Sequence, residues 1–318
     1  MRYLIIDKRQ RVENSNDNNI STASLRLIEE LDKKNIPNDL AYLDQIEFEF
    51  VDGETKIRVN TKDIKEYSHI IFRGHDLHKP QEYEIKRYIV DWAEQYNSTN
   101  PEQKLLVQNA QAIKNFPYYN KIAMAIFCSL NNIPYFDTYY RTDGKYPTSQ
   151  RDILNDYPLI VKEYAGVNRV QLIDGEEKIK KNVFKLETDQ DYNQENLKNQ
   201  NLSNFFLQAF STEKADIRIF VKLGKIIGGW KRESTDSFMT VSKGIYSLYN
   251  TPDERITEIS QNVARLLDAD FIAVDFMYMN GEPLLQEFSY HPGFKAYETK
   301  IEGEPLNIAE EIITAFKE

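Results

Sequence analysis

Two acidic residues interrupt apolar stretches near the end of the chain. Asp275 lies in "DFIAVDFMYMNG" and Glu287 lies in "LLQEFSYHPGF". The Asn-Gly pair between the two apolar runs is typical of a tight hairpin, so we expect antiparallel strands that bring the carboxylates close together. Neighbouring carboxylates repel unless a cation neutralises them, and Mg²⁺ takes oxygen ligands from one or two carboxylates. The pair therefore indicates a magnesium site, unless each side chain faces solvent from its own strand.

Four cationic residues precede this pair along the chain. Lys121 lies near the start of an apolar helical segment, Lys162 ends "PLIVK", Arg218 lies in "DIRIFV" and Arg232 ends "IIGGWKR". Taken alone, lysines at such positions are usually only solvated, and each arginine either faces solvent or points into a cleft. The order Lys, Lys, Arg, Arg, Asp, Glu along successive elements suits a nucleoside triphosphate bound with magnesium. No "GxxxxGK[ST]" occurs, so a Walker-type loop does not supply the phosphate contacts.

The N-terminal hundred residues alternate between strand-like and helix-like segments. Such alternation favours a parallel or mixed α/β sheet. We expect strands at 2–7, 69–74 and 104–109, helices at 24–36 and 81–96, and a hairpin at 46–60 around Asp52-Gly53. The Asn-rich residues 13–19 predict a loop.

A second region begins near Asn109 and has a different pattern. Runs of strands with helices segregated between them predict an α+β arrangement. We expect helices at 118–131, 253–268 and 306–317, with strands at 158–173, 205–210, 216–232, 238–249, 270–279 and 283–289. The polar residues 186–204 predict a surface connection.

Composition limits the class of protein. The chain has 318 residues, of which 41% are hydrophobic and 28% charged, and this is ordinary for a globular protein of about two domains. No apolar run is long enough for a membrane span, and the first strand is too short for a secretory signal. The net charge of −10 argues against general nucleic-acid binding. The single Cys128 cannot form an internal disulfide, so we expect a cytoplasmic protein.

From about Asn109 onward the sequence resembles the ATP-grasp ligases, and within them the RimK-type carboxylate–amine ligases. The resemblance covers about two-thirds of the chain, and the matching stretches occur in family order. They are "NKIAMAIFCSLNNIPYFDT", "PLIVKEYAGVNRVQLI", "LQAF", "DIRIFV", "KIIGGWKRES", "DFIAVDFMYMNGEPLLQEFSYHPG" and "YETKIEGEPLNIAEEII".

The resemblance implies a role for each candidate site residue. Lys121 and Lys162 would contact ATP phosphates, and Asp216 would approach the ribose. The backbone of Gln208, Ala209 and Phe210 would hold adenine. Arg218 and Arg232 would face the γ-phosphate and the acyl phosphate. Asp275, Glu287 and Ser289 would bind Mg²⁺, or Mn²⁺ in its place.

The chain departs from the family pattern at four positions. Ser289 stands where the family has Asn, and Ala209 stands where an acidic residue is common. The glycine-rich phosphate loop is reduced to "EYAGVNRV", and the stretch "FMTVSKG" lacks the Asn expected in its middle. His291, before Pro292-Gly293, takes the place of a small residue and either touches a substrate or lies in a surface turn.

The resemblance implies an ATP-grasp fold with an α/β lobe at 1–108 and an ATP-grasp region at 109–318, divided into a middle lobe at about 120–208 and a C-terminal lobe at about 209–318. The implied reaction joins a carboxylate to an amine through an acyl phosphate, on amino-acid or peptide substrates. One alternative is a ligase that tailors a ribosomal peptide. Another is a nucleotide-binding regulatory protein without turnover, which Ser289 and the shortened loop favour. Homodimers are common in the family, and we expect no nucleic-acid or membrane partner.

Overall fold

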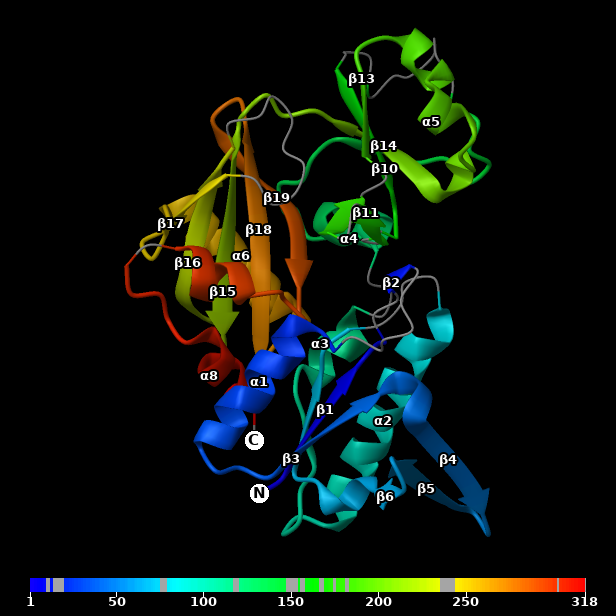
Figure 1. Cartoon of the computed structure of the whole chain (residues 1–318), viewed down its shortest axis with the longest axis vertical. Helices are drawn as coiled ribbons and strands as arrows, with labels where there is room; N and C mark the ends of the chain where they lie inside the picture. The colour runs from blue at the N-terminus through cyan, green and yellow to red at the C-terminus, as the bar shows by residue number, and fades with distance from the viewer. Residues whose placement is uncertain are drawn as a thin grey trace.

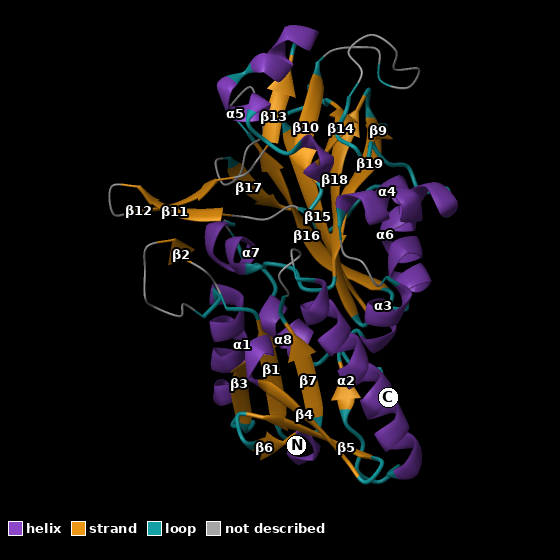
Figure 2. Cartoon of the chain, turned by 90° about the vertical axis from the view of Figure 1, so that its right-hand side faces the viewer, coloured by secondary structure: helices purple, strands orange, loops and turns teal. Residues whose placement is uncertain are grey.

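The computed structural model describes residues 1–9, 12–13, 20–74, 79–116, 120–146, 154, 158–165, 169–173, 176–180, 183–234, 244–301 and 303–317. Figures 1 and 2 show three groups of strands, arranged along the long axis of the molecule. No helix within the described ranges is long and apolar enough to cross a membrane.

The N-terminal group is a parallel sheet in the order β3-β1-β7-β8. All five residues of its strand Tyr3–Asp7 are buried, because helices and neighbouring elements cover both faces of a parallel sheet. Its helices have ordinary start signals, a Ser21 cap on the first and a proline in the first turn of the second. The elements are β1 Tyr3–Asp7, β2 Val12–Glu13, α1 Thr22–Lys33, β3 Asn38–Tyr42, β4 Ile46–Val51, β5 Glu54–Val59, β6 Lys62–Asp63, β7 His69–Phe72, α2 Pro80–Thr99, β8 Leu106–Val107 and α3 Ala110–Asn115.

The middle group contains a sheet in the order β13-β10-β14-β9 and a hairpin, β11–β12. Short β2 from the N-terminal group pairs in parallel with β11, so this hairpin meets the N-terminal part of the chain. Buried apolar residues on the four-stranded sheet form a core of their own. The elements are α4 Lys121–Leu130, β9 Thr138–Tyr139, β10 Leu159–Glu163, β11 Arg169–Ile173, β12 Glu176–Lys180, β13 Val183–Leu186, α5 Glu195–Lys198 and β14 Phe205–Ala209.

The C-terminal group is an antiparallel sheet in the order β17-β16-β15-β18-β19. Alternate residues of the central strand, among them Ile217 and Ile219, belong to one apolar core with the amphipathic helix α6. The opposite face carries Asp216 and Arg218. The elements are β15 Ala215–Lys222, β16 Lys225–Glu233, β17 Ile245–Leu248, α6 Glu254–Leu267, β18 Phe271–Met279, β19 Glu282–Ser289, α7 Lys295–Lys300 and α8 Ile308–Ile313.

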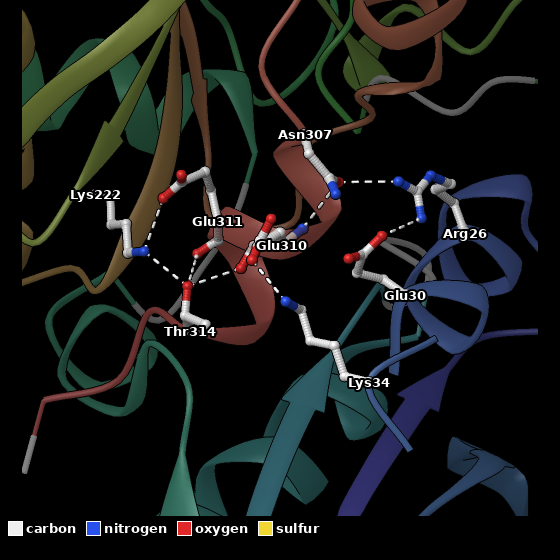
Figure 3. Close-up of polar contacts among 8 residues, drawn as sticks. All are labelled: Arg26, Glu30, Lys34, Lys222, Asn307, Glu310, Glu311 and Thr314. Atoms are coloured by element: carbon white, nitrogen blue, oxygen red, sulfur yellow. Dashed lines mark hydrogen bonds and ion pairs between the residues drawn. The ribbon is translucent and has the colours of Figure 1, made fainter. Parts of the chain in front are cut away.

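Helix α8, near the C-terminus, contacts elements of both the N-terminal and the C-terminal groups. It lies beside α1, as Figure 1 shows, and polar contacts extend from it to both α1 and β15 (Figure 3). Lys34 Nζ of the α1 C-cap lies 2.6 Å from a Glu310 carboxylate oxygen, and Lys222 Nζ of β15 lies 2.7 Å from Glu311. These contacts of α8 therefore connect helix α1 of the N-terminal group with strand β15 of the C-terminal sheet.

The structure refines several expected elements. The expected strand at 216–232 is two strands joined by Leu223-Gly224, both at positive φ, a turn that the long apolar run concealed. Strand β3 was not predicted, and the connection at 186–204 contains the short helix α5. The predicted Asn280-Gly281 hairpin is confirmed, with both residues at positive φ as such a turn requires. The loop expected at 13–19 and the first part of the strand expected at 238–249 lie outside the described residues, apart from Glu13.

Candidate active site

A pocket lies between the middle sheet and the ends of β18 and β19. Four of the residues expected to bind the nucleotide line it, namely Lys162, Gln208, Ala209 and Phe210. Its walls also include apolar side chains from several strands. The complete lining is Phe136, Ile160, Lys162, Val183, Gln208, Ala209, Phe210, Ser211, Thr212, Glu213, Lys214, Met277 and Gln286.

Polar contacts inside the pocket orient its side chains. Lys162 Nζ donates to Gln208 Oε1 at 2.8 Å, and Gln208 Nε2 donates to Thr138 Oγ1 at 3.2 Å. Pairing of β10 with β14 brings these two side chains together, because Ile160 lies opposite Gln208 and Lys162 lies two residues further along β10, on the same face of the sheet. The Phe210 ring packs beneath Lys185, whose Nζ lies 4.5 Å from the ring centroid. Apolar walls with a few fixed polar groups are typical of a site for a planar base.

A row of charged and aromatic residues crosses the C-terminal sheet. The pairing of β16, β15, β18 and β19 places Trp230, Arg218, Asp275 and Glu287 side by side. Arg218 donates to both Asp275 oxygens, at 2.7 and 2.6 Å, and its third nitrogen donates to the Gly293 carbonyl at 2.8 Å. Burial alone would lower the pKa of Arg218, but the Asp275 carboxylate outweighs it and raises that pKa. Arg218 is therefore held as a fixed positive charge.

A second ion pair lies one row further along the same sheet face. Arg232 donates to both oxygens of Asp216, at 2.8 and 2.5 Å. Burial raises the pKa of Asp216, and Arg232 only partly offsets this. The Trp230 ring lies between the two arginines, with the guanidinium carbons of Arg218 and Arg232 at 5.5 and 5.9 Å from its centroid. Asp216, expected to approach a ribose, here holds Arg232 in place.

Lys121 completes the row at its far end. Its Nζ lies 2.6 Å from a Glu287 oxygen, and its backbone N–H donates to the Tyr164 carbonyl at 3.1 Å. The Asn120 side chain caps α4 and thereby fixes Lys121 as the first helical residue. Helix α4 thus carries a cation from the middle group to the metal-site candidates of the C-terminal sheet.

The residues expected to bind magnesium share one face of the hairpin. Asp275 and Glu287 are direct partners in the ladder, and Ser289 lies two residues beyond Glu287, next to Ala273 on β18. The described residues contain no group of three or more His, Cys, Asp or Glu able to hold a metal. Magnesium in nucleotide sites needs only one or two carboxylates, since phosphate oxygens and water complete its shell. Two adjacent carboxylates fit this requirement.

The sequence pattern does not mark every residue of the site. It indicates Trp230, which lies between the two arginines, only as part of an apolar strand, and it gives no signal for Met277 or Gln286. The change of register between Asp275 and Phe276 leaves Gln286 as an extra residue in β19, and no sequence signal marks such a bulge. Two of the four departures from the family pattern involve residues outside the described ranges. They are the reduced loop, which includes 166–168, and the missing Asn, which falls within 235–243. These two departures therefore stay predictions.

The family follows from a direct comparison of the sequence. A family model described as the RimK-like ATP-grasp domain matches residues 147–316, just over half of the chain. The protein therefore belongs to the RimK-like ATP-grasp family, which confirms the resemblance.

One curated protein is similar to part of the chain. A probable alpha-L-glutamate ligase from Hydrogenovibrio crunogenus (strain DSM 25203 / XCL-2) is 31% identical over 117 residues, which are 35% of this chain and 37% of that protein. The match thus spans little more than a third of that curated relative.

Solved structures confirm the fold over nearly the full length. The ATP-grasp ligase PsnB, complexed with its minimal precursor, has a TM-score of 0.64 at 12% identity and aligns over 98% of this chain and 99% of its own. The D-alanine–D-alanine ligase from Bacillus anthracis, complexed with ATP, has a TM-score of 0.59 at 14% identity, over 99% and 97% of the two chains. The predicted ATP-grasp fold is therefore correct.

Proposed function

We propose that the protein is an ATP-dependent ligase that joins a carboxylate to an amine through an acyl phosphate. One observation carries this proposal. A pocket lined by Lys162, Gln208, Ala209 and Phe210 lies beside a row of paired charges on the C-terminal sheet. Family membership supports the same reaction class.

The proposed binding mode places the base between the middle and C-terminal sheets. The phosphates then extend from Lys162 toward the row that Arg218, Asp275 and Glu287 form. We place the lobe boundaries at Asn109 and near Ala209, so that the nucleotide lies between the middle and C-terminal lobes. The sheet memberships support this division, since the N-terminal parallel sheet ends at Val107.

The chain's own residues act mainly by position and charge. Arg218 and Arg232 are each held by a carboxylate, so their positive charges are fixed on the sheet face where the transferring phosphoryl group would lie. The substrate carboxylate attacks the γ-phosphorus of ATP, ADP leaves, and an acyl phosphate forms. The amine then attacks the acyl carbon and inorganic phosphate leaves.

Asp275 and Glu287, with Ser289 beside them, are the residues that would hold Mg²⁺ or Mn²⁺. The ion would offset charge on the ATP phosphates. PsnB has also been solved with Mg and ADP, which supports magnesium as the first choice. Besides its proposed contact with an ATP phosphate, Lys121 would limit the repulsion between the two carboxylates, because its Nζ lies 2.6 Å from Glu287.

A peptide substrate is the second possibility within this reaction class. The support is that PsnB, whose fold is similar over nearly the full length, is complexed with a precursor peptide. A small amino-acid substrate has comparable support from the partial match to a probable glutamate ligase.

Hydroxylamine trapping tests the reaction class without knowledge of the natural amine. The protein is incubated with ATP, MgCl₂, hydroxylamine and single carboxylic acids, which include acidic amino acids and their peptides. An acyl phosphate reacts with hydroxylamine to a hydroxamate, so we expect hydroxamate and ADP in equal amounts with the correct acid. ADP release without hydroxamate for every acid would contradict the ligase and leave only an ATPase. Nucleotide binding with no ADP release would favour the regulatory alternative.

A further inference from the structure

Trp230 contacts both arginines on the charged face of the C-terminal sheet. It lies directly opposite Arg218 in the pairing of β15 with β16, and two residues before Arg232 on the same face of β16. The guanidinium carbons of Arg218 and Arg232 lie 5.5 and 5.9 Å from the centroid of its ring. A cation within about 6 Å of a tryptophan ring is attracted by the ring. One indole therefore attracts both cations that face the proposed phosphoryl group.

The indole ring is itself held by its neighbours. The exposed fraction of Trp230 is only 7%, and the residue belongs to an apolar cluster with Phe220 of β15 and Tyr297 of α7. The ring of Tyr246 on β17 meets it edge-on, with 5.3 Å between the centroids and 65° between the planes. Rings in this arrangement attract each other. Trp230 thus lies where the apolar cluster ends and the charged residues begin.

Arg232 has further contacts along its side chain. Its guanidinium carbon lies 6.0 Å from the centroid of the Tyr246 ring, and Tyr246 is its direct partner on β17. A Cβ placed on Gly244 would lie 2.9 Å from Arg232 Cγ, so the backbone at this glycine passes close to the aliphatic stem. The side chain of Arg232 is therefore confined from its stem to its guanidinium group.

A ring contact differs from an ion pair in the donors that it leaves available. Asp275 and Asp216 accept hydrogen bonds from N–H groups of Arg218 and Arg232. A phosphoryl group must compete with these carboxylates for the same donors. The attraction between a cation and a ring needs no particular N–H group. The indole therefore holds both cations while their N–H groups turn to a bound anion.

We propose that Trp230 is a positioning residue that sets the spacing between Arg218 and Arg232 at the phosphoryl-transfer site. This inference rests on the proposed function and adds a residue that acts through the two arginines. Both guanidinium groups must meet oxygens of one phosphoryl group in the transition state, and a displacement of about 1 Å can lower the rate about 100-fold. Binding of ATP in the ground state depends less on this spacing.

The test compares two substitutions of Trp230. Trp230→Leu removes the ring and keeps an apolar side chain, whereas Trp230→Phe keeps a smaller ring. Trp92→Leu is the matched control, because Trp92 is the other tryptophan of the chain and packs against a core from helix α2. Hydroxamate formation, with an acid that the parent accepts, gives kcat and the KM for ATP. Thermal unfolding of each variant gives its melting temperature.

We expect Trp230→Leu to lower kcat about 10- to 100-fold, with the KM for ATP within about threefold of the parent. Trp230→Phe should stay within about fivefold of the parent kcat, because a ring still contacts the arginines. Trp92→Leu should lower the melting temperature, as Trp230→Leu does, since both shorten a packed side chain. Its kcat should nevertheless match that of the parent. An unchanged kcat in folded Trp230→Leu would overturn the proposal.

A double-mutant cycle shows whether Trp230 acts through Arg232. Trp230→Leu is made in the parent and in Arg232→Lys, in which the position of the guanidinium is already lost. We expect Trp230→Leu to lower kcat by less than about threefold in Arg232→Lys, because residues that act together have non-additive effects. An equal loss of kcat in both backgrounds would show a merely structural tryptophan and overturn the proposal.

Fluorescence covers the case in which Trp230→Leu does not fold. Trp92→Phe leaves Trp230 as the single tryptophan. We expect AMPPNP with MgCl₂ and the acid to change its emission, because the guanidinium groups beside the ring then turn to the anion. Addition of Arg232→Lys should reduce this change.

Trp230 emission that does not respond, or that responds equally with Arg232 and with Lys at this position, would overturn the proposal. The parent separates this failure from that of the proposed function. Absence of ADP release and hydroxamate in the parent with every acid would reject the proposed ligase, and the inference with it.

Discussion

At the scale of single residues, the candidate site is a set of paired charges. Arg218 pairs with Asp275, Arg232 with Asp216 and Lys121 with Glu287, all at 2.5 to 2.6 Å. Within each pair, the two opposite charges neutralise each other. A ligand must therefore share or displace some of these partners, and magnesium would compete with Lys121 for Glu287.

Glu287→Gln tests the metal site because it keeps the side-chain shape and removes one charge. We expect the magnesium concentration for half-maximal ADP release to rise at least tenfold, since a carboxylate ligand is lost. Folding stability should change by less than about 1 kcal/mol, because loss of the Lys121 pair is offset by relief of repulsion with Asp275. Activity against magnesium concentration and urea unfolding measure the two effects.

Glu282→Gln is the control for this change, because Glu282 lies in the same strand but is exposed. Its magnesium requirement should equal that of the parent. Ser289→Asn is the converse test, since it restores the oxygen ligand usual in the family, and we expect it to hold or improve magnesium affinity. Unchanged magnesium dependence in both Glu287→Gln and Ser289→Asn would show that the hairpin binds no metal.

Arg232→Lys separates the charge of this residue from its forked geometry. Lysine still neutralises buried Asp216, so the protein should fold, but it cannot make the two parallel bonds of a guanidinium. We expect kcat to fall at least tenfold with the KM for ATP within about threefold, because the lost contact matters mainly in the transition state. Lys231→Arg, at the neighbouring position that pairs with Glu233, should behave as the parent. A normal kcat in Arg232→Lys would remove Arg232 from the phosphoryl site.

At the scale of elements, one asparagine joins α3 to the C-terminal sheet. Asn109 is buried with a positive φ, and its backbone N–H donates to Asp270 Oδ2 at 2.6 Å. Its side chain bonds the backbone of Asp270, Phe271 and Tyr290. The junction between the N-terminal group and β18 therefore depends on a few buried polar contacts.

This junction predicts a specific dependence of stability on pH. Burial raises the pKa of Asp270 from 3.8 to about 6, against the opposing effect of the Asn109 hydrogen bond. The folded state thus holds the Asp270 proton more tightly than the unfolded state. This contribution to stability is complete below about pH 4 and is lost as the pH rises through about 6. The shift of about two units corresponds to about 3 kcal/mol.

Asp270→Asn removes the titration and retains an oxygen that can accept from Asn109. Relative to the parent, we expect the variant to gain free energy of unfolding between pH 4 and pH 7, by up to about 3 kcal/mol. Urea unfolding across this pH range measures the difference. A constant difference for Asp270→Asn would contradict the buried titration.

At the scale of the whole molecule, the walls of the proposed nucleotide pocket come from two different sheets. Ile160 and Val183 come from the middle sheet, whereas Met277 and Gln286 come from the C-terminal sheet. A ligand bound between them ties the two sheets together, so it should stabilise the folded protein as a unit.

AMPPNP with MgCl₂ is expected to raise the melting temperature by about 5 °C at 100 times its Kd, since binding at that level adds about 2.7 kcal/mol. Lys162→Ala should bind about tenfold more weakly and show a smaller shift at the same concentration, because one charged contact to phosphate is lost. Lys198→Ala, at an exposed position of α5, should shift like the parent. Equal shifts for Lys162→Ala and the parent would place the phosphates elsewhere.

The sequence by itself determined the family, most strand positions and the pairing of Asp275 with Glu287. These follow from local patterns, because the Asn280-Gly281 turn and the alternation of apolar residues set the register of a hairpin. The four candidate cations were also identified from residue types and their order along the chain. Predicted roles in binding and catalysis remain predictions.

Only the tertiary structure decided which charges are partners. Lys121 reaches Glu287 across 166 residues and Arg218 reaches Asp275 across 57. Arg73 reads in the sequence as the end of a strand, yet it is buried against a carbonyl 219 residues away. Local propensity sets helices, turns and strand register, whereas burial and charge pairing depend on which distant surfaces meet when the sheets pack together.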